Sequence, residues 1–356
     1  MGCDLTVLVS AMEEAVATGV FPGCQLVALE KGALRVDLCA GREAFGGASA
    51  VTPETIYDLA SLTKPLAGLS LVLHLVNEGQ LDLTSPIKRW VSDLTQHPLG
   101  GVTLSHLLSH TSGLPAWKPF YEILAPLPKA QKGDALNAAL RECSLDFEPG
   151  ERRVYSDIGF LLLQEVVETV AGASVGELYN ALVRPKLPPG APCYAKDLEP
   201  RVRVAPTEAC PWRQKTLCGE VHDDNTWSMG GEALHAGLFG TARGVAFSVW
   251  EMHRATRGEG RLCGDYRGAI HSRVPLGVDR PSPEGSASGH LFSPGSWGHL
   301  GFTGTSFWVD PARDLVVVLL SNRVHPSREN LAIREFRPRI HDLLMSVCCV
   351  TAPEKA

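Results

Sequence analysis

The stretch ASLTKP, residues 60–65, places a hydroxyl and an amine three positions apart. Residues i and i+3 of a helix share a face, so Ser61 and Lys64 should point to the same side. Pro65 is tolerated in the first turn of a helix but not in its interior, which makes residues 61–64 the opening turn. A serine there lies beside unpaired backbone N–H groups. It becomes a nucleophile when a base takes its proton, and a lysine with a lowered pKa can be that base.

By itself this spacing also fits a serine that caps a helix and is followed by a surface lysine. Further stretches along the chain decide between the two interpretations. They are ASLTK at 60–64, LLSHTSGLP at 107–115, YSD at 155–157 and GHLGFTGTSFWVDP at 298–311, with VHDDN at 221–225 and HAGLFGT at 235–241. In this order they resemble the serine β-lactamase and penicillin-binding protein superfamily, and within it the class C-like branch that includes esterases and D-peptidases.

The resemblance implies a role for each matching residue. Ser61 would be the acylated nucleophile and Lys64 its proton partner. Tyr155 would be a second base, its phenolate favoured by the lysine cation. The backbone N–H groups of Ser61 and Phe302 would form the oxyanion hole, because acyl transfer needs donors aimed at the developing negative charge. No cofactor is implied.

Two positions depart from the commonest family pattern. Asp157 stands where the family usually has asparagine, and a carboxylate near Lys64 favours the charged amine. This departure favours a proton relay centred on Tyr155. His299, Leu300 and Gly301 form the strand edge that is Lys-Thr-Gly or His-Thr-Gly in relatives. Leu300 lacks the hydroxyl that helps to hold a substrate carboxylate, which speaks against β-lactams and D-Ala-terminated peptides as substrates.

The elements around these motifs indicate an α+β fold, an α/β/α sandwich of the β-lactamase/transpeptidase type. An antiparallel sheet should be flanked by N- and C-terminal helices, with a mostly helical domain inserted. Residues 1–81 and 230–356 should form the sheet domain and residues 82–229 the insertion, with the active site in the cleft between them. The expected elements are a helix ending at Gly19, a hairpin over 23–41, helices over 61–78, 241–258 and 328–347, and strands over 299–311 and 314–323.

Composition narrows the function classes. The chain has 356 residues and a net charge of −6, with no long basic run, so nucleic acid is an unexpected partner. No apolar run is long enough to span a membrane. The N-terminus lacks a basic segment before its apolar residues, and none of the ten cysteines is spaced CxxC. We therefore expect a cytoplasmic protein, although removal of a signal peptide from a periplasmic protein would leave the same pattern. The oligomeric state stays open.

Two other kinds of site were weighed. His106 and His110 have the i, i+4 spacing of metal-binding histidines, but no glutamate follows His106 and no further ligand is obvious, so no metal is predicted. The sequence HDD at 222–224 is expected to be a solvated loop or a loop at the rim of the active site.

The predicted function is a serine hydrolase that works through a covalent acyl-enzyme on Ser61. Its substrates would be small esters or amides, as in a β-lactamase-related carboxylesterase or a D-peptidase or amidase, with weak β-lactamase activity as a further option. The alternative is a non-catalytic penicillin-binding sensor or scaffold protein of the same fold.

Overall fold

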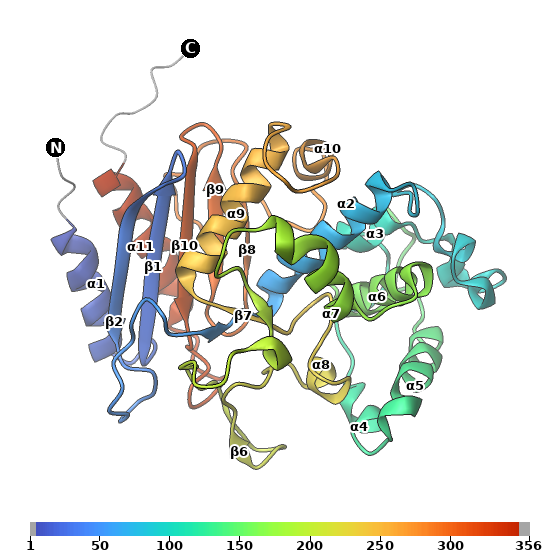
Figure 1. Ribbon diagram of the computed structural model, residues 1–356, viewed down its shortest axis with the longest axis horizontal. Coiled ribbons are helices and arrows are strands. Elements are labelled where there is room, and N and C mark those ends of the chain that lie inside the picture. Colours follow the sequence, from blue (N-terminus) through green and yellow to red (C-terminus); the bar gives the residue numbers. More distant parts are fainter. Residues whose placement is uncertain (1–4, 349–356) are drawn as a thin grey trace.

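The computed structural model describes residues 5–348. The first four residues of the N-terminal segment, on which the absence of a signal peptide was predicted, lie outside it. Its main sheet has five antiparallel strands in the order β2-β1-β10-β9-β8 (Figure 1). The strands are β1 (Gly23–Glu30), β2 (Ala33–Gly41), β8 (Trp297–Leu300), β9 (Ser306–Asp310) and β10 (Leu315–Ser321).

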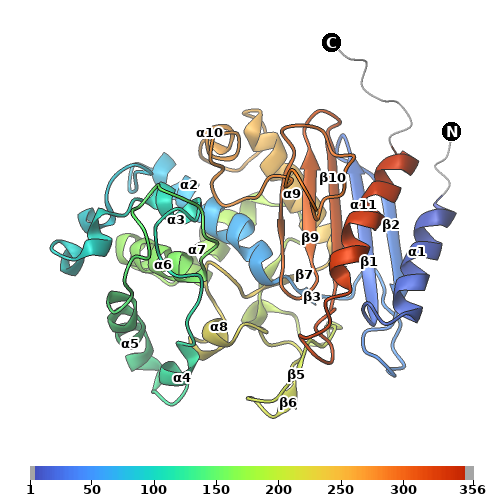
Figure 2. The same cartoon turned by 180° about the vertical axis from the view of Figure 1, so that it is seen from behind.

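Helices cover both faces of this sheet. The terminal helices α1 (Thr6–Ala17) and α11 (Ile333–Cys348) lie on one face, and α9 (Ala242–Thr256) lies on the other (Figures 1 and 2). Because both faces are covered, β10 is apolar along almost its whole length and all seven of its residues are buried. The predicted α+β sandwich with flanking terminal helices is confirmed.

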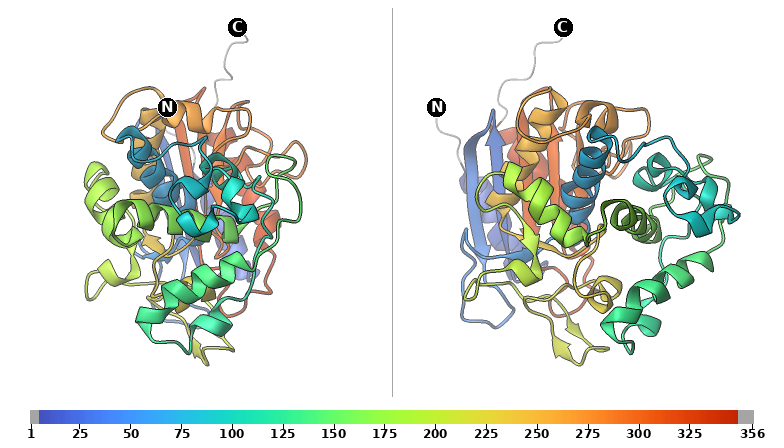
Figure 3. Two further views of the ribbon diagram at one scale, coloured as in Figure 1. Left: turned by 90° about the vertical axis from the view of Figure 1, so that its right-hand side faces the viewer. Right: turned by 45° about the vertical axis from the view of Figure 1, so that its right-hand side comes forward.

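The rest of the chain is mostly helical and lies beside the sheet (Figure 3). Its α-helices are α2 (Ser70–Asn77), α3 (Leu104–Leu108), α4 (Tyr121–Leu124), α5 (Lys129–Arg141), α6 (Asp157–Ala171), α7 (Val175–Leu178), α8 (Asp224–Ser228) and α10 (Tyr266–Ile270). One hydrophobic cluster runs from Val27 and Val318 in the sheet to Leu71 in α2 and Phe160 in α6. The two parts therefore share a core, and the domain boundaries at 82 and 229 stay a prediction.

The helix predicted over 61–78 has three sections. A 3-10 turn, Ala60–Leu62, is followed by a π-helix, Lys64–Leu69, and then by α2. The wide turn has a local cause, since Pro65 has no N–H and its carbonyl accepts the Ser70 hydroxyl at 3.2 Å. The tight opening turn around Ser61 matches the prediction, whereas the π-helix was not predicted.

The single strand predicted over 299–311 is wrong, because a turn at 301–305 divides it into β8 and β9. Gly304 in this turn has a φ of +108°, which residues other than glycine rarely adopt. The hydroxyls of Thr303 and Thr305 bind the carbonyls of Asp58 and Leu59, at 2.7 and 3.1 Å. The turn is thereby fixed to the segment that precedes Ser61.

Short strands complete the scaffold. β3 (Tyr57–Asp58) and β4 (Cys193–Tyr194) pair on either side of β7 (Leu238–Gly240). A separate hairpin contains β5 (Ala209–Cys210) and β6 (Lys215–Thr216). Over residues 5–348, no single helix meets the length and hydropathy needed to cross a bilayer. The segments Asp157–Ala171 and Val175–Lys186 meet it only together, and they are bent by 70°.

Candidate active site

Ser61 follows a residue with an unusual backbone. Ala60 has a φ of +47°, in the left-handed region that non-glycine residues seldom occupy. Its N–H donates to Oδ1 of Asp58 at 2.8 Å, and its carbonyl accepts the Thr63 hydroxyl at 2.7 Å. These bonds hold the turn in its strained form. Ser61 stays partly exposed, while Lys64 on the same side is fully buried.

The ammonium of Lys64 has three acceptors, which is its full complement. Nζ lies 3.0 Å from Oγ of Ser61, 2.6 Å from Oδ1 of Asp157 and 3.2 Å from the carbonyl of His235. Burial alone would lower the pKa of Lys64, but the Asp157 carboxylate and Tyr155 more than offset it, so that the pKa is raised. The resting lysine is therefore a cation.

Tyr155 adjoins both residues. The Lys64 and Ser61 side chains both act on its hydroxyl, and Nζ of Lys64 lies 4.8 Å from the centroid of its ring. The ring is 37% exposed, and its centroid lies 4.4 Å from that of His110. Burial of the hydroxyl raises the pKa of Tyr155, while Lys64 lowers it without cancelling the rise. The predicted support of a phenolate by Lys64 is thus one of two opposing effects, and the resting side chain is a phenol.

The end of β8 lies directly against the Ser61 turn. A Cβ atom on Gly301 would come within 1.9 Å of Oγ1 of Thr305 and 2.7 Å of the Leu59 carbonyl, so only glycine fits. The next residue, Phe302, is 50% exposed. Within residues 5–348, the N–H groups of Ser61 and Phe302 donate to no other residue. Their role as an oxyanion hole stays a prediction.

His299 and Leu300 differ in exposure. His299 is buried, its Nδ1 donates to the Leu300 carbonyl at 2.8 Å, and its Nε2 has no partner among the described residues. Burial lowers the pKa of His299, which keeps the ring neutral with Nε2 as an acceptor. Leu300 is partly exposed and presents no polar side-chain atom. The edge beside the oxyanion position therefore offers little to a substrate carboxylate.

Three residues without a predicted role support the site. The carbonyl of His235 binds Lys64, and Nε2 of its ring lies 3.1 Å from Oδ1 of Asp223. Asp58 is buried and holds both the Ala60 N–H and the His222 N–H, the latter at 2.6 Å. Two of these residues lie in stretches that carry a partial signal, because HAGLFGT and VHDDN resemble the family without an assigned function. Asp58 had no signal at all.

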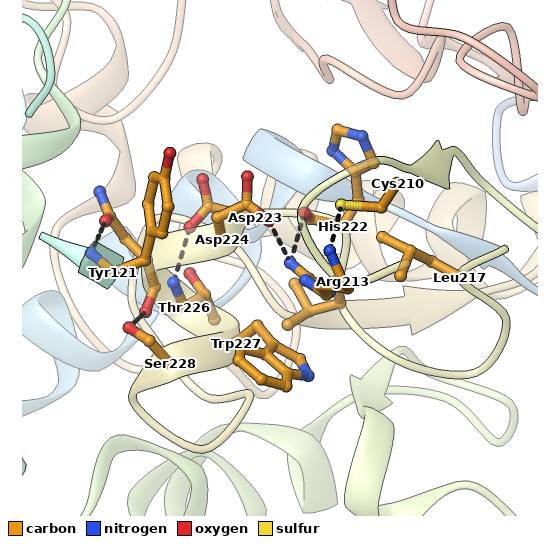
Figure 4. A network of polar contacts seen from close by, with 12 residues as sticks. Tyr121, Cys210, Arg213, Leu217, His222, Asp223, Asp224, Thr226, Trp227 and Ser228 are labelled. Carbon is orange, nitrogen blue, oxygen red and sulfur yellow. Dashed lines mark hydrogen bonds and ion pairs between the residues drawn. The ribbon is translucent and has the colours of Figure 1, made fainter. Parts of the chain in front are cut away.

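Of the two expectations for residues 222–224, the solvated loop is wrong, and a loop at the rim of the active site stays a prediction. His222 is buried, and Nε2 of its ring binds Glu208 at 3.0 Å. Arg213, whose side chain is 2% exposed, donates to the His222 carbonyl at 2.9 Å and to Asp224 at 2.6 Å (Figure 4). Arg328 completes the network with two bonds of 2.8 Å to Glu208. Residues 222–224 are therefore packed against the site, where the buried His222 donates its N–H to Asp58.

The histidine pair considered for a metal has other partners. Nδ1 of His106 accepts the Thr103 N–H at 3.3 Å and caps α3. Nδ1 of His110 accepts the Ser156 N–H at 3.1 Å. Ser156 is the N-cap of α6, and the ring of His110 packs against Tyr155, so His110 positions the start of that helix.

Comparison with known proteins agrees with this geometry. The family model described as Beta-lactamase matches residues 8–337. The chain belongs to the Beta-lactamase family. A protein named "Putative D-alanyl-D-alanine carboxypeptidase" from Salmonella agona (strain SL483) is 28% identical over 315 residues, with 77% of this chain and 71% of the relative covered.

Solved structures share the fold. EstCE1, a hydrolase with promiscuous acyltransferase activity, superposes with a TM-score of 0.72 at 20% identity, over 94% of this chain and 98% of its own. A class C β-lactamase from Rhodobacter sphaeroides gives a TM-score of 0.68 at 20% identity, over 95% and 99% of the two chains. With its family shown, this Beta-lactamase family member is a serine hydrolase.

Proposed function

We propose that this Beta-lactamase family member hydrolyses small neutral esters through an acyl-enzyme on Ser61. The observation that carries the proposal is the 3.0 Å contact between Nζ of Lys64 and Oγ of Ser61, in a turn where the serine alone is accessible. Tyr155 adjoins the pair, with Nζ of Lys64 4.8 Å from the centroid of its ring. A nucleophile with a positioned proton acceptor is what covalent acyl transfer requires.

The proton path follows from the charge of the resting site. Lys64 and Tyr155 are both protonated, so the pair must lose one proton before it can accept the proton of Ser61. Ser61 then attacks the ester carbonyl, and the pair later gives that proton to the departing alcohol. Water repeats the sequence on the acyl-enzyme and releases the acid. Activity should therefore rise with pH as the pair loses its first proton.

The choice of neutral substrates rests on the end of β8. Leu300 supplies no donor, and the one N–H of neutral His299 is already bound to a carbonyl. A carboxylate placed there would be poorly solvated, which costs several kcal/mol, whereas an ester bears no such charge. Penicillins, cephalosporins and D-Ala-terminated peptides should therefore be much poorer substrates than esters.

A panel of p-nitrophenyl esters, nitrocefin and D-Ala-D-Ala peptides tests this choice. We expect the highest kcat/KM for the esters. Nitrocefin hydrolysis comparable with that of the best ester would overturn the proposal. Mass spectrometry after exposure to a fluorophosphonate or a β-lactam adds a second measurement, because a permanent β-lactam adduct on Ser61 without ester turnover would indicate the sensor alternative.

A reducing compartment belongs to the same proposal. The seven cysteines whose side chains the structure describes are free thiols, and a chain of this size does not need disulfides to fold. Thiol titration of protein taken rapidly from its native source would test this, and quantitative disulfide formation would contradict it.

A further inference from the structure

Four aromatic side chains gather beside the candidate site, at α4, α8 and the β5–β6 hairpin. Ring centroids lie 6.3 Å apart for Trp117 and Tyr121, 4.6 Å for Tyr121 and Trp212, and 5.4 Å for Trp212 and Trp227. Trp117 is 46% exposed and Trp212 41%, while Tyr121 and Trp227 are half-buried. We call these four residues the aromatic face. They form a row of packed rings that is still open to solvent.

One end of the aromatic face is attached to the reaction centre. Trp117 directly follows Ala116, whose carbonyl accepts the Asp157 N–H at 2.9 Å. Asp157 in turn binds Lys64, which binds Ser61. These contacts and ordinary bond lengths place the Trp117 backbone within about 16 Å of the Ser61 hydroxyl. A substrate with a chain of several atoms beyond its carbonyl can span much of that distance.

The other end approaches the oxyanion side. Trp227 lies in α8, the helix that follows His222, and the His222 ring stacks on Phe302 with centroids 5.6 Å apart. The side chain of Asn225 donates to the Lys118 carbonyl at 2.9 Å and accepts the Tyr121 N–H at 2.8 Å. Asn225 therefore fixes α8 to the loop that carries Trp117. The aromatic face is thus linked to the site through Asp157 at the Trp117 end and through the His222 loop at the Trp227 end.

The charges beneath the aromatic face are paired within the protein. The Arg213 guanidinium lies 4.8 Å from the Trp227 ring centroid and is neutralised by Asp224 (Figure 4). Glu208 and Arg328 neutralise each other in the same network. Glu220, which accepts the Trp227 Nε1–H at 2.9 Å, pairs with Lys215 at 2.7 Å, so each of these charges has a partner of opposite sign. The exposed part of the aromatic face is largely ring carbon. Such a surface suits an uncharged ligand with an aromatic ring. Binding would bury apolar surface of both partners and allow the rings to stack.

We propose that the aromatic face binds the apolar tail of the substrate, and that the enzyme prefers neutral esters with an aryl group a few atoms from the scissile carbonyl. This inference rests on the proposed function and gives it a substrate class. The tail contacts Trp117 and Trp212, the two most exposed rings, while Ser61 attacks the carbonyl. A small ester without a ring, such as ethyl acetate, reaches Ser61 but leaves the aromatic face uncovered.

The test compares ethyl acetate with ethyl 4-phenylbutyrate and 4-phenylbutyl acetate, which place the ring on the acyl and the alcohol side. Hydrolysis is followed by proton release. We expect at least one ring-bearing ester to exceed ethyl acetate in kcat/KM by about tenfold or more, and Trp117→Ala/Trp212→Ala to remove about tenfold of that preference. Phe45→Ala is the matched control, since Phe45 is also 41% exposed but stacks on His325. This control should keep the preference.

A second measurement separates this inference from the proposed function. Saturation-transfer NMR on Ser61→Ala reports binding of ethyl 4-phenylbutyrate without turnover. Binding that depends on the two tryptophans, in a protein that hydrolyses no ester, would reject the function and keep the aromatic face as a binding surface. An unchanged ester preference and unchanged binding in the double variant would overturn the inference. So would a shift from oligomer to monomer with unchanged preference, because the face would then be an interface between two copies.

Discussion

The centre beneath Ser61 and the aromatic face beside it are built on opposite principles. In the centre, charged groups are buried and each has fixed partners, as Lys64 has with Asp157 and the His235 carbonyl. In the aromatic face, large apolar rings stay open to solvent, and Trp117 is nearly half exposed. In the centre, the neighbouring groups hold the charges in place. In the aromatic face, the rings leave apolar area exposed to solvent.

The difference separates two tasks of a hydrolase. Buried charges have little freedom to reorganise, so under the proposed mechanism the centre should provide the same proton path for any ester that reaches Ser61. Half-exposed rings can gain burial when a ligand arrives, so the aromatic face can distinguish one ester from another. We therefore expect changes in the centre to abolish or shift the reaction, and changes at its edge to alter substrate preference.

Removal of the nucleophile should have the largest effect. Ser61→Ala should keep the fold and lose nearly all hydrolysis, because Ser61 carries the one serine hydroxyl within residues 5–348 that Lys64 binds. Ester turnover and circular dichroism measure the two properties. Retention of more than a few per cent of activity, after contaminating esterases are excluded, would contradict the division into a reacting centre and a selecting edge.

Lys64 and Tyr155 should behave as one unit. Each of Lys64→Ala and Tyr155→Phe interrupts the same proton path, with an expected loss of about 10²–10⁴-fold in kcat. The double variant should be little worse than the worse single variant. Steady-state kinetics of the three variants measure this, and fully additive losses would show that the residues act independently.

Glu208 tests whether the network below the site stabilises the protein. Partners His222 and Arg328 outweigh the effect of burial and lower the pKa of Glu208 to about 2. The stabilisation is therefore complete above about pH 4.5 and is lost as the pH falls through about 2. Glu208→Gln should lower the free energy of unfolding at pH 7 by on the order of 3 kcal/mol, and the difference from the wild type should shrink at acidic pH. Urea titrations at several pH values measure it, and a constant difference would contradict the assignment.

Leu300, at the end of β8, tests how the site discriminates between anionic and neutral substrates. Leu300→Thr adds a hydroxyl where the structure presents only carbon, and an anionic substrate should regain about 1–3 kcal/mol of transition-state binding. The measurement is kcat/KM for nitrocefin relative to a neutral ester. Leu300→Val is the matched control, since it changes shape without adding a donor. Equal gains in both variants would show that space and not hydrogen bonding limits the anionic substrate.

Asp157 should have the smallest effect, on pH dependence. The Asp157 carboxylate raises the pKa of Lys64, so Asp157→Asn removes that support and lets the lysine lose its proton more easily. Activity that the wild type reaches only at alkaline pH should then appear at lower pH. A profile of kcat/KM against pH measures the shift, and an unchanged profile would mean that Asp157 does not control the proton of Lys64.

The sequence alone determined much of the fold, the family and the residues that we propose to react. The hairpin over 23–41 was predictable because its two apolar runs flank Lys31 and Gly32, which both take positive φ in the structure. Helix α9 was predictable from its apolar spacing. The short motifs also predicted that Ser61, Lys64, Tyr155 and Asp157 would lie together, as they do, although their catalytic roles stay a prediction.

Tertiary structure decided the rest, because it depends on contacts between segments far apart in the chain. No local pattern shows that the Asp58 carboxylate, the His235 carbonyl or the Thr303 hydroxyl would meet near Ser61. The protonation states of Lys64 and Tyr155 likewise follow from burial balanced against neighbours that only folding supplies. The aromatic face is the clearest case, since its four rings come from three separate segments and become a surface only when α4, α8 and the β5–β6 hairpin pack together.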